Sequence, residues 1–299
     1  MLHYKDFELK NYTSFKIGGK AKNVYLPETN EEFVELLQTL PHPIVLGGMS
    51  NVLIASAGVF EDVILTKKLN KFSINDNEIY AQAGVMGPIL SRQACENSLS
   101  GMEFMCGFPG SVGGIVSMNA GAHGQCISEI FEKATVFDCK NKELKIFYKN
   151  DMNFEYRKSI ILNSDLILID ATFCLLNKEK DLILEKVKEN NEFRKNKQPN
   201  LSKPNCGSVF KNPQNVSAGM LLDSIGAKEF QVGGAKVYEN HANFIINFDN
   251  ATSCDVLKLM KKMYNKVYEK YSIRLIPEVR FIGDKTEEEK EIWNELLNN

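Results

Sequence analysis

The sequence predicts an α+β protein whose last third forms a separate α+β unit. Short apolar runs bounded by Gly, Asn and Pro are typical of strands, and they recur between residues 43 and 85. Segments with apolar residues at the spacing of one helical face stand between such runs. The chain has 299 residues, of which 43% are hydrophobic. That length allows one large domain or two to three smaller ones.

The elements of the first half are predicted from periodicity and from capping residues. Phe33, Leu36, Leu37 and Leu40 lie on one helical face, and Thr29 or Asn30 can cap that helix. Pro88 is suited to the first turn of a second helix. The predicted elements are a helix at 30–40, strands at 43–46 and 52–54, short strands over 63–85 that turn at 75–77, and a helix over 88–99.

The second half alternates strands and helices in the same way. β-branched and apolar residues favour strands, and a longer apolar periodicity favours helices. The predicted elements are a hairpin over 134–148 turning at 140–142, a strand at 166–176, a charged amphipathic helix at 179–197, a helix at 218–225, a strand at 244–246, a helix at 252–271 and a strand at 278–282.

Composition excludes several classes of protein. The 36 Lys and Arg residues against 38 Asp and Glu give a net charge of -2, so we expect no nucleic-acid partner. The N-terminus lacks an apolar signal region, and no stretch approaches the roughly 18 to 20 apolar residues of a membrane span. We therefore expect a cytoplasmic protein with no membrane partner. The seven cysteines include no CxxC pair, which favours reduced packing thiols over disulfides or a metal site.

The segment at 47–51 is the first candidate ligand loop. Gly47 and Gly48 follow a strand, and Met49, Ser50 and Asn51 complete the loop. Backbone amides and small polar side chains in such a loop can cradle a diphosphate. An ordinary turn between strands is the alternative, since glycine occurs in most loops.

A second glycine-rich segment covers residues 107–124. It contains six glycines in eighteen residues, so its backbone can approach a flat ligand closely. Neither segment has the GxGxxG pattern of dinucleotide-binding folds or the GxxxxGK[ST] pattern of triphosphate-binding loops. Two separate glycine-rich clusters indicate one extended ligand, such as a flavin dinucleotide.

These segments, in this order, resemble the UDP-N-acetylenolpyruvoylglucosamine reductase (MurB) family. The resemblance extends from about residue 11 to residue 283, and the order of the motifs makes chance agreement improbable. The matching motifs lie at 11–19, 47–51, 101–104, 107–114, 119–122, 156–159, 206–213, 219–226, 241–244 and 276–279.

The resemblance implies a two-subdomain FAD-binding fold of the vanillyl-alcohol oxidase (PCMH) type, followed by a C-terminal α+β substrate-binding domain. We expect the FAD-binding subdomains at 1–55 and 56–198, and the substrate domain with a charged tail at 199–299. The stretch between Arg157 and Ser208 is short, as in the type II branch, which lacks the substrate-covering loop of type I. We expect a monomer.

The family implies NADPH-dependent, FAD-mediated reduction of the enolpyruvyl ether of UDP-N-acetylglucosamine-enolpyruvate to UDP-N-acetylmuramate, a step of peptidoglycan precursor synthesis. The positions that match the FAD-binding motifs are Gly47, Gly48, Met49, Ser50, Asn51, Gly107, Pro109, Gly110, Ser111, Gly113, Gly114, Ala120 and Gly121. The positions that match substrate contacts are Tyr156, Lys197, Asn212, His241 and Asn243.

Three residues match the catalytic positions of the family. Hydride addition to the terminal methylene places negative charge on the adjacent carbon and the carboxylate, and Arg157 and Glu278 match the groups that stabilise it. Ser208 matches the proton donor. Each has an ordinary alternative: Arg157 as a solvated surface residue, Ser208 as a backbone cap and Glu278 as an exposed strand residue.

Several other readings stay open. His241 can equally be a hydrogen-bonded core residue, and Cys206 is interpreted as a packing thiol. Met49 replaces a third glycine of the family motif, which restricts the loop if that position needs a positive φ. Phe108 replaces the usual Ile beside the flavin. An oxidase of the same superfamily and a nucleotide-binding protein without catalysis are the competing functions.

Overall fold

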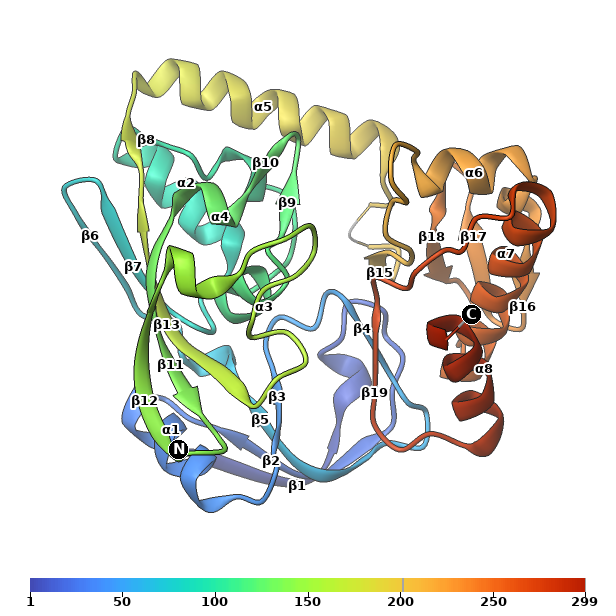
Figure 1. Cartoon of the computed structure of the whole chain (residues 1–299), viewed down its shortest axis with the longest axis horizontal. Coiled ribbons are helices and arrows are strands. Elements are labelled where there is room, and N and C mark those ends of the chain that lie inside the picture. Colours follow the sequence, from blue (N-terminus) through green and yellow to red (C-terminus); the bar gives the residue numbers. More distant parts are fainter. Residues whose placement is uncertain (201, 299) are drawn as a thin grey trace. The chain divides into compact units, whose positions relative to one another are not determined.

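The computed structural model describes residues 1–200 and 202–298 (Figure 1). The chain divides into two compact units, each assembled from segments that are distant in the sequence. The first unit comprises Met1–Tyr4, Val24–Gly48 and Asp62–Arg194. The second comprises Lys5–Asn23, Met49–Glu61 and Lys195–Asn299.

The N-terminal elements form a four-stranded sheet. Its strands are ordered β1 (Leu2–Glu8), β2 (Lys20–Leu26), β5 (Val59–Leu65) and β3 (Ile44–Leu46), and β3 runs parallel to β5. Helix α1 (Asn30–Thr39) follows β2, and the Thr29 hydroxyl accepts a hydrogen bond of 3.2 Å from the Glu32 amide. The predicted helix and its cap are therefore confirmed. Phe33 and Leu37 of α1 pack with Ile64 in a small core.

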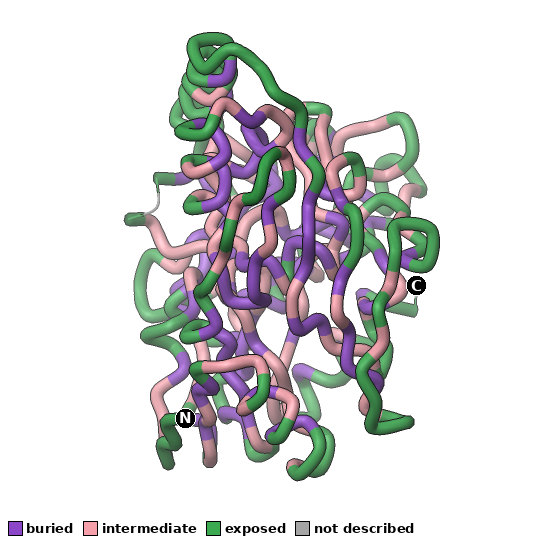
Figure 2. The backbone as a smooth tube through the Cα atoms, turned by 90° about the vertical axis from the view of Figure 1, so that its left-hand side faces the viewer, coloured by how far each residue is buried: buried purple, intermediate pink, exposed green. Residues whose placement is uncertain are grey.

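A five-stranded antiparallel sheet forms the centre of the first unit. Its order is β12 (Glu143–Tyr148), β11 (Phe131–Asp138), β13 (Leu166–Cys174), β7 (Glu78–Gln82) and β6 (Phe72–Asn75). The predicted turn at 75–77 lies between β6 and β7, and the hairpin predicted over 134–148 is formed by β11 and β12. Helix α3 (Val112–Ser117) packs against β13 and β7. The buried residues of this unit lie mainly in these strands and in the helices that cover them. Figure 2 colours the backbone of the chain by burial.

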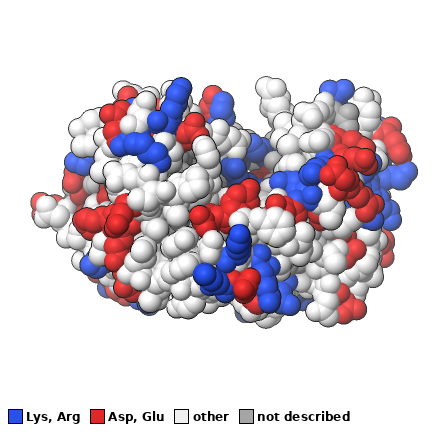
Figure 3. All heavy atoms as spheres, turned by 90° about the horizontal axis from the view of Figure 1, so that it is seen from below, with Lys and Arg blue, Asp and Glu red and all other residues white. Residues whose placement is uncertain are grey.

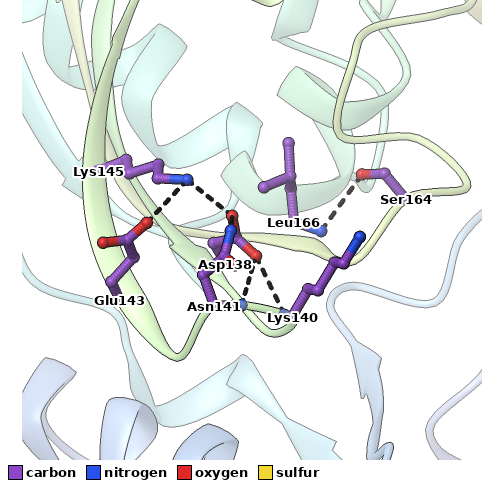
Figure 4. Close-up of polar contacts among 7 residues, drawn as sticks. All are labelled: Asp138, Lys140, Asn141, Glu143, Lys145, Ser164 and Leu166. Atoms are coloured by element: carbon purple, nitrogen blue, oxygen red, sulfur yellow. Dashed lines mark hydrogen bonds and ion pairs between the residues drawn. The ribbon is translucent and has the colours of Figure 1, made fainter.

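Asp138 organises the turn of the β11–β12 hairpin (Figure 4). One carboxylate oxygen accepts hydrogen bonds of 3.0 Å from the Lys140 and Asn141 amides, and the other accepts 2.8 Å bonds from the Asn141 side chain and Lys145 Nζ. Lys145 and Asn141 hold the pKa of Asp138 below its ordinary range. The carboxylate thus replaces the backbone partners that the turn lacks.

The second predicted helix ends earlier than expected. Helix α2 covers Gly87–Glu96, with Pro88 in its first turn as predicted. The amide of Asn97 bonds to the carbonyls of Gln93 and Ala94, which closes the helix. Residues Leu99–Ser100 form the short strand β8, which pairs with β14 (Leu176–Asn177). The predicted extension of the helix to residue 99 is therefore wrong, because Leu99 pairs with Asn177 in a short antiparallel sheet.

The remaining elements of the first unit are short, apart from one long helix. The long helix is α5 (Lys180–Lys197), which lies in this unit up to Arg194 (Figure 1). Its buried residues are Ile183 and Asn190. It was predicted as amphipathic, but its buried face is narrow. The other short elements are β9 (Gly121–Ala122), β10 (Gln125–Cys126) and α4 (Ile127–Ile130).

The second unit contains a four-stranded antiparallel sheet and three helices. The sheet order is β15 (Asn205–Ser208), β18 (His241–Asn247), β17 (Ala235–Tyr238) and β16 (Gln231–Val232). Helix α6 (Ala218–Ser224) packs on β18, and α7 (Ser253–Tyr271) packs on β16 and β17. Strand β19 (Arg280–Ile282) runs parallel to β4 (Val52–Ile54). The predicted helices and strands of this part are present.

Several elements were not predicted, among them β1, β2 and the last helix. Strands β1 and β2 begin with exposed or polar residues and lack a strong apolar alternation. Helix α8 (Glu287–Asn298) forms where a charged tail was expected. Its Ile292 and Leu296, four residues apart, join the core of the second unit beside α7. The acidic first turn of α8 concealed this apolar face at the sequence level.

Charge and thiol chemistry are unremarkable over the described residues. On the face shown in Figure 3, basic and acidic side chains are interspersed. All seven cysteines are free thiols. Across residues 1–200 and 202–298, every helix is too short or too polar to cross a membrane. Within the same residues, no group of three His, Cys, Asp or Glu side chains is placed to hold a metal ion.

Met49 adopts a backbone conformation that favours glycine. Its φ is 47°, and its side chain is 7% exposed. Its carbonyl accepts a hydrogen bond of 3.2 Å from the Ser14 amide, which fixes the loop. A left-handed residue with a Cβ costs roughly 1–2 kcal/mol, and the buried side chain offsets that cost. The loop position therefore does require positive φ, and Met49 tolerates it through burial.

We expect Met49→Ala to lower the free energy of unfolding by about 2–5 kcal/mol, because it removes a buried side chain and keeps the strained φ. Met49→Gly loses the same side chain but relieves the strain, so it should be about 1 kcal/mol more stable than Met49→Ala. Chemical denaturation of the two variants measures this difference. If Met49→Ala is the more stable of the two, the left-handed conformation does not carry the cost assigned to it.

Candidate active site

Two glycine-rich segments of the first unit lie against each other. The Gly48 amide donates a hydrogen bond of 3.0 Å to Ser111 Oγ. A Cβ built on Gly47 would overlap Ser111 Oγ, and one built on Gly48 would lie 2.9 Å from the Pro109 carbonyl oxygen. Glycine is thus required here by close approach of the two segments. This contact joins two predicted FAD-binding motifs that are about sixty residues apart.

The segment that follows Pro109 is fixed by main-chain bonds to the turn before α2. The Gly87 amide donates to the Gly110 carbonyl, and the Gly113 amide donates to the Ala83 carbonyl, both at 2.8 Å. Helix α3 begins at Val112. A Cβ on Gly114, in the first turn of α3, would meet nothing within 4 Å. The segment is therefore fixed by main-chain bonds and leaves open space at Gly114.

Arg157 lies in a tight turn that is anchored to residues 119–121. The turn is closed by reciprocal bonds between the main chains of Glu155 and Lys158, and Arg157 has a φ of 55°. Its Nη2 donates a bond of 2.9 Å to the Gly121 carbonyl, and the Asn119 amide group donates one of 2.9 Å to the Glu155 carbonyl. The structure thus brings Arg157 beside the predicted positions Ala120 and Gly121.

Tyr156, Gly107 and Phe108 complete the predicted positions of the first unit. Tyr156 is exposed, and the Arg157 guanidinium lies 5.1 Å from the centroid of its ring. Phe108 packs at 6.0 Å from Phe104, so the replacement of Ile is accommodated by an aromatic contact. Gly107 lies beneath the side chain of Arg194, which would meet a Cβ at 2.5 Å.

Ser208 ends strand β15, next to a register shift in its pairing with β18. Asn205 pairs with Ile246 and Ser208 with Phe244, and Gly207 between them has a φ of 82°. Such irregularities redirect side chains at functional sites. Among the described residues, no group forms a hydrogen bond with the Ser208 hydroxyl. The hydroxyl is therefore not used as a backbone cap.

Glu278 lies beside Ser208 in the second unit, although seventy positions separate them in the sequence. The Glu278 amide donates a bond of 2.8 Å to the carbonyl of Val209, the residue after Ser208. The Glu278 carbonyl accepts a bond of 3.0 Å from Asn51 Nδ2. Asn51, Ser208 and Glu278, predicted from three separate motifs, therefore converge on one stretch of main chain.

Asn243 fixes the main chain next to Ser208 by two hydrogen bonds. It is 2% exposed, and its side chain accepts a bond from the Phe210 amide at 3.1 Å and donates one to the Phe210 carbonyl at 2.8 Å. Both polar atoms of the amide group are thus committed to the main chain. Asn243 was predicted as a substrate contact, but its geometry is that of a clamp that positions the strand carrying Ser208.

His241, Asn212 and Lys197 occupy the neighbouring surface of the second unit. His241 Nδ1 accepts a bond of 3.2 Å from the Asn243 amide, and its ring packs on Phe244. Burial lowers the pKa of His241, and the charges of Lys228 and Lys197 lower it further. Asn212 Oδ1 accepts a bond of 3.0 Å from the Ala218 amide at the start of α6. Lys197 is exposed at the end of α5.

Cys206 is a packing residue, as interpreted from the sequence. Its side chain is 1% exposed and belongs to the core of the second unit. Burial raises the pKa of its thiol well above the ordinary value. A thiol in this state is not a nucleophile.

Sequence reasoning gave no role to two half-buried arginines. Burial lowers the pKa of both Arg194 and Arg280. Among residues 1–200 and 202–298, no group accepts a hydrogen bond from either guanidinium. A sequence signal existed for Arg280, because it directly follows the family-matching motif at 276–279.

A comparison with known families assigns the two parts of the chain. Residues 21–146 match the model of an FAD binding domain. The chain is thus a flavoprotein with a second domain after the flavin-binding part. Residues 198–282 match the model of the UDP-N-acetylenolpyruvoylglucosamine reductase C-terminal domain.

Whole-chain relatives define the family. The UDP-N-acetylenolpyruvoylglucosamine reductase of Caldicellulosiruptor bescii is 42% identical over 286 residues, which covers 94% of this chain and 90% of the relative. That of Carboxydothermus hydrogenoformans is 38% identical, with 92% of each chain covered. The crystal structure of UDP-N-acetylenolpyruvylglucosamine reductase (MurB) from Thermus caldophilus is 32% identical with a TM-score of 0.81, covering 94% of this chain and 98% of that one.

The chain belongs to the UDP-N-acetylenolpyruvoylglucosamine reductase (MurB) family. The predicted family, enzyme class and FAD cofactor are confirmed, as is an α+β fold with an FAD-binding part before a C-terminal domain. The residues present fit FAD, because the tight contact of Gly47 and Gly48 with Ser111 and Pro109 brings the two motifs together, and Gly114, a predicted position, leaves open space where a side chain would stand. Backbone amides in such loops bind phosphate well.

A matched pair of glycine variants tests this assignment. Gly47→Ala should destabilise the fold by about 1–3 kcal/mol, because the new Cβ overlaps Ser111 Oγ. Gly114→Ala should fold with unchanged stability, since its Cβ enters open space, and should lose FAD affinity if the flavin lies against α3. Thermal unfolding of the apoprotein and FAD titration separate the two effects. Unchanged FAD binding in Gly114→Ala would remove α3 from the flavin site.

Proposed function

We propose that this protein reduces the enolpyruvyl ether of UDP-N-acetylglucosamine-enolpyruvate to UDP-N-acetylmuramate, with NADPH as the reductant. The observation that carries the proposal is the 42% identity to a UDP-N-acetylenolpyruvoylglucosamine reductase over 94% of this chain. The geometry around Ser208 and Glu278 supports it, because two motif residues distant in the sequence share one rigid stretch of main chain. We keep the domain boundaries at 55 and 198 as part of this proposal.

Bound FAD supplies the hydride, and the protein supplies charge stabilisation and a proton. Addition of hydride to the methylene carbon leaves negative charge on the adjacent carbon and on the carboxylate. Arg157 is suited to that charge because its turn is anchored at both ends and one guanidinium nitrogen is already fixed on the Gly121 carbonyl. A cation held before the reaction pays no reorganisation cost when the charge develops.

Glu278 would stabilise the same charge together with Arg157, and Ser208 would deliver the proton to the adjacent carbon. The main chain of Glu278 is fixed on both sides by Val209 and Asn51, so its side chain starts from a defined position. The Ser208 hydroxyl forms no hydrogen bond within the described residues, so it can donate to a ligand without breaking a bond in the protein. Serine is a weak acid, but a carbanionic carbon is a strong base.

The remaining predicted contacts suit the sugar nucleotide. Lys197 is an exposed point charge that can follow a diphosphate, and it is close enough to His241 to lower the pKa of that imidazole. Asn212 and Tyr156 offer polar groups on exposed surface. We assign Asn243 a positioning role, because both polar atoms of its side-chain amide form hydrogen bonds with the main chain of Phe210.

The decisive experiment follows the flavin absorbance of the purified, FAD-loaded full chain. NADPH should bleach the flavin band, and the UDP-linked enolpyruvyl sugar should restore it under anaerobic conditions with formation of UDP-N-acetylmuramate. Rapid recovery of the band in air without the sugar identifies an oxidase instead. A protein that binds FAD but reacts with neither NADPH nor the sugar is a binding protein, and the proposed reaction is then wrong.

Ser208→Ala tests the proton donor. We expect reduction of the flavin by NADPH to stay close to the wild-type rate, because no proton is delivered to substrate in that step. Reoxidation by the enolpyruvyl sugar should slow by roughly 10²–10⁴-fold, the usual contribution of a general acid. Stopped-flow absorbance resolves both half-reactions. Ser73→Ala is the control, since Ser73 is an exposed serine of β6, and equal slowing of both half-reactions in Ser208→Ala rules out this role.

A further inference from the structure

Strand β19 has one buried residue between two half-buried ones. Phe281 belongs to the core of the second unit together with Val279 and Leu53 of β4. Successive side chains of a strand point to opposite faces, so Arg280 and Ile282 share the face away from Phe281.

Arg280 is a half-buried cation without an anion. In the part of the chain that the structure describes, its guanidinium has no carboxylate, carbonyl or aromatic partner. Arg92 and Arg274 have one, since Arg92 lies 3.7 Å from Glu96 and the Arg274 guanidinium lies 5.9 Å from the centroid of the Tyr268 ring, whereas Arg194 resembles Arg280. Partial burial of an unpaired charge is unfavourable, and burial lowers the pKa of Arg280 accordingly. Such a charge increases the affinity of the site for an anion.

The position of Arg280 indicates which anion this is. Its amide donates a bond of 3.0 Å to the Asn51 carbonyl, and it pairs in register with Val52. The guanidinium therefore extends from the strand that flanks the end of the 47–51 loop. That loop lies within the region matching the FAD binding domain and contains no basic residue. A diphosphate bound there carries two negative charges that backbone amides compensate only in part.

We propose that Arg280 binds the diphosphate of FAD and compensates the charge that the 47–51 loop leaves. Its planar guanidinium can bond two phosphate oxygens at once, which lysine does not. The inference rests on FAD binding and does not depend on reduction of the enolpyruvyl sugar. Its failure and the failure of that function are therefore distinguishable: loss of FAD affinity is measured without NADPH or the sugar substrate.

The test compares FAD binding to the apoproteins of wild type, Arg280→Met and Arg280→Lys, with Arg274→Met as the control. We expect Arg280→Met to raise the Kd for FAD about tenfold or more, to weaken the dependence of Kd on ionic strength, and to leave the midpoint potential of bound flavin unchanged. Arg280→Lys should recover part of the affinity. Arg274, an exposed residue stacked on Tyr268, should be replaceable without effect.

Stability of the apoprotein provides the second readout. Arg280→Met removes a half-buried cation that has no partner in the described apoprotein. The unfolding temperature of the apo variant should therefore equal or exceed that of the apo wild type. The increase in unfolding temperature that FAD produces should be smaller in the variant than in the wild type. A lower unfolding temperature of the apoprotein would show a structural role and overturn the proposal. An unchanged Kd for FAD would also overturn it, and an unchanged Kd with a shifted midpoint potential would place the guanidinium at the flavin ring.

Discussion

The predicted chemistry of the second unit depends on one short stretch of main-chain pairing. Phe210 and Pro277 form an isolated antiparallel bridge, and bonds of 2.8 Å on either side join Glu278 to Val209 and Lys211 to Ile276. This pairing joins the end of β15 to the segment before β19. Without it, Ser208 and Glu278 would be held by separate elements with no common reference. Asn243 and Asn51 secure the two partners by their side-chain amides.

Three residues of the family-matching motifs adopt left-handed backbone conformations. Met49, Asn119 and Arg157 have positive φ values of 47°, 41° and 55° although each carries a side chain. Each is fixed by a specific bond: the Met49 carbonyl to Ser14, the Asn119 side chain to Glu155 and the Arg157 guanidinium to Gly121. Strain of this kind persists only where surrounding contacts determine the conformation. These contacts therefore act to preorganise the loops for a ligand.

Unpaired polar groups show a second kind of preorganisation. The Ser208 hydroxyl and the Arg280 guanidinium have no hydrogen-bond partner within residues 1–200 and 202–298. Both residues are close in sequence to the paired segments around Phe210 and Pro277. The Ser208 hydroxyl is an uncharged hydrogen-bond donor, and the Arg280 guanidinium is a cation. A protein that leaves such groups unsatisfied in its own fold loses stability and gains affinity when a ligand supplies the partner.

The sequence by itself determined the local elements and the family. Helix α1 with its Thr29 cap, the β11–β12 hairpin and α7 follow from periodicity and capping, which are properties of neighbouring residues. Linear motifs indicated FAD and the residues to examine. Leu99 and α8 were mispredicted or missed because strand pairing and core packing, both nonlocal, decided them.

Only the tertiary structure decided how the motif residues are used. A spacing pattern cannot show that the Asn243 amide binds Phe210, that Ser111 leaves room only for glycine at position 47, or that Arg280 has no partner among the described residues. Each of these depends on which distant segment approaches and at what distance. Hydrogen bonds and burial depend on distance in space and not on distance along the chain. Residues far apart in the sequence therefore determine the hydrogen-bonding and charge state of a side chain that a motif only identifies as a candidate.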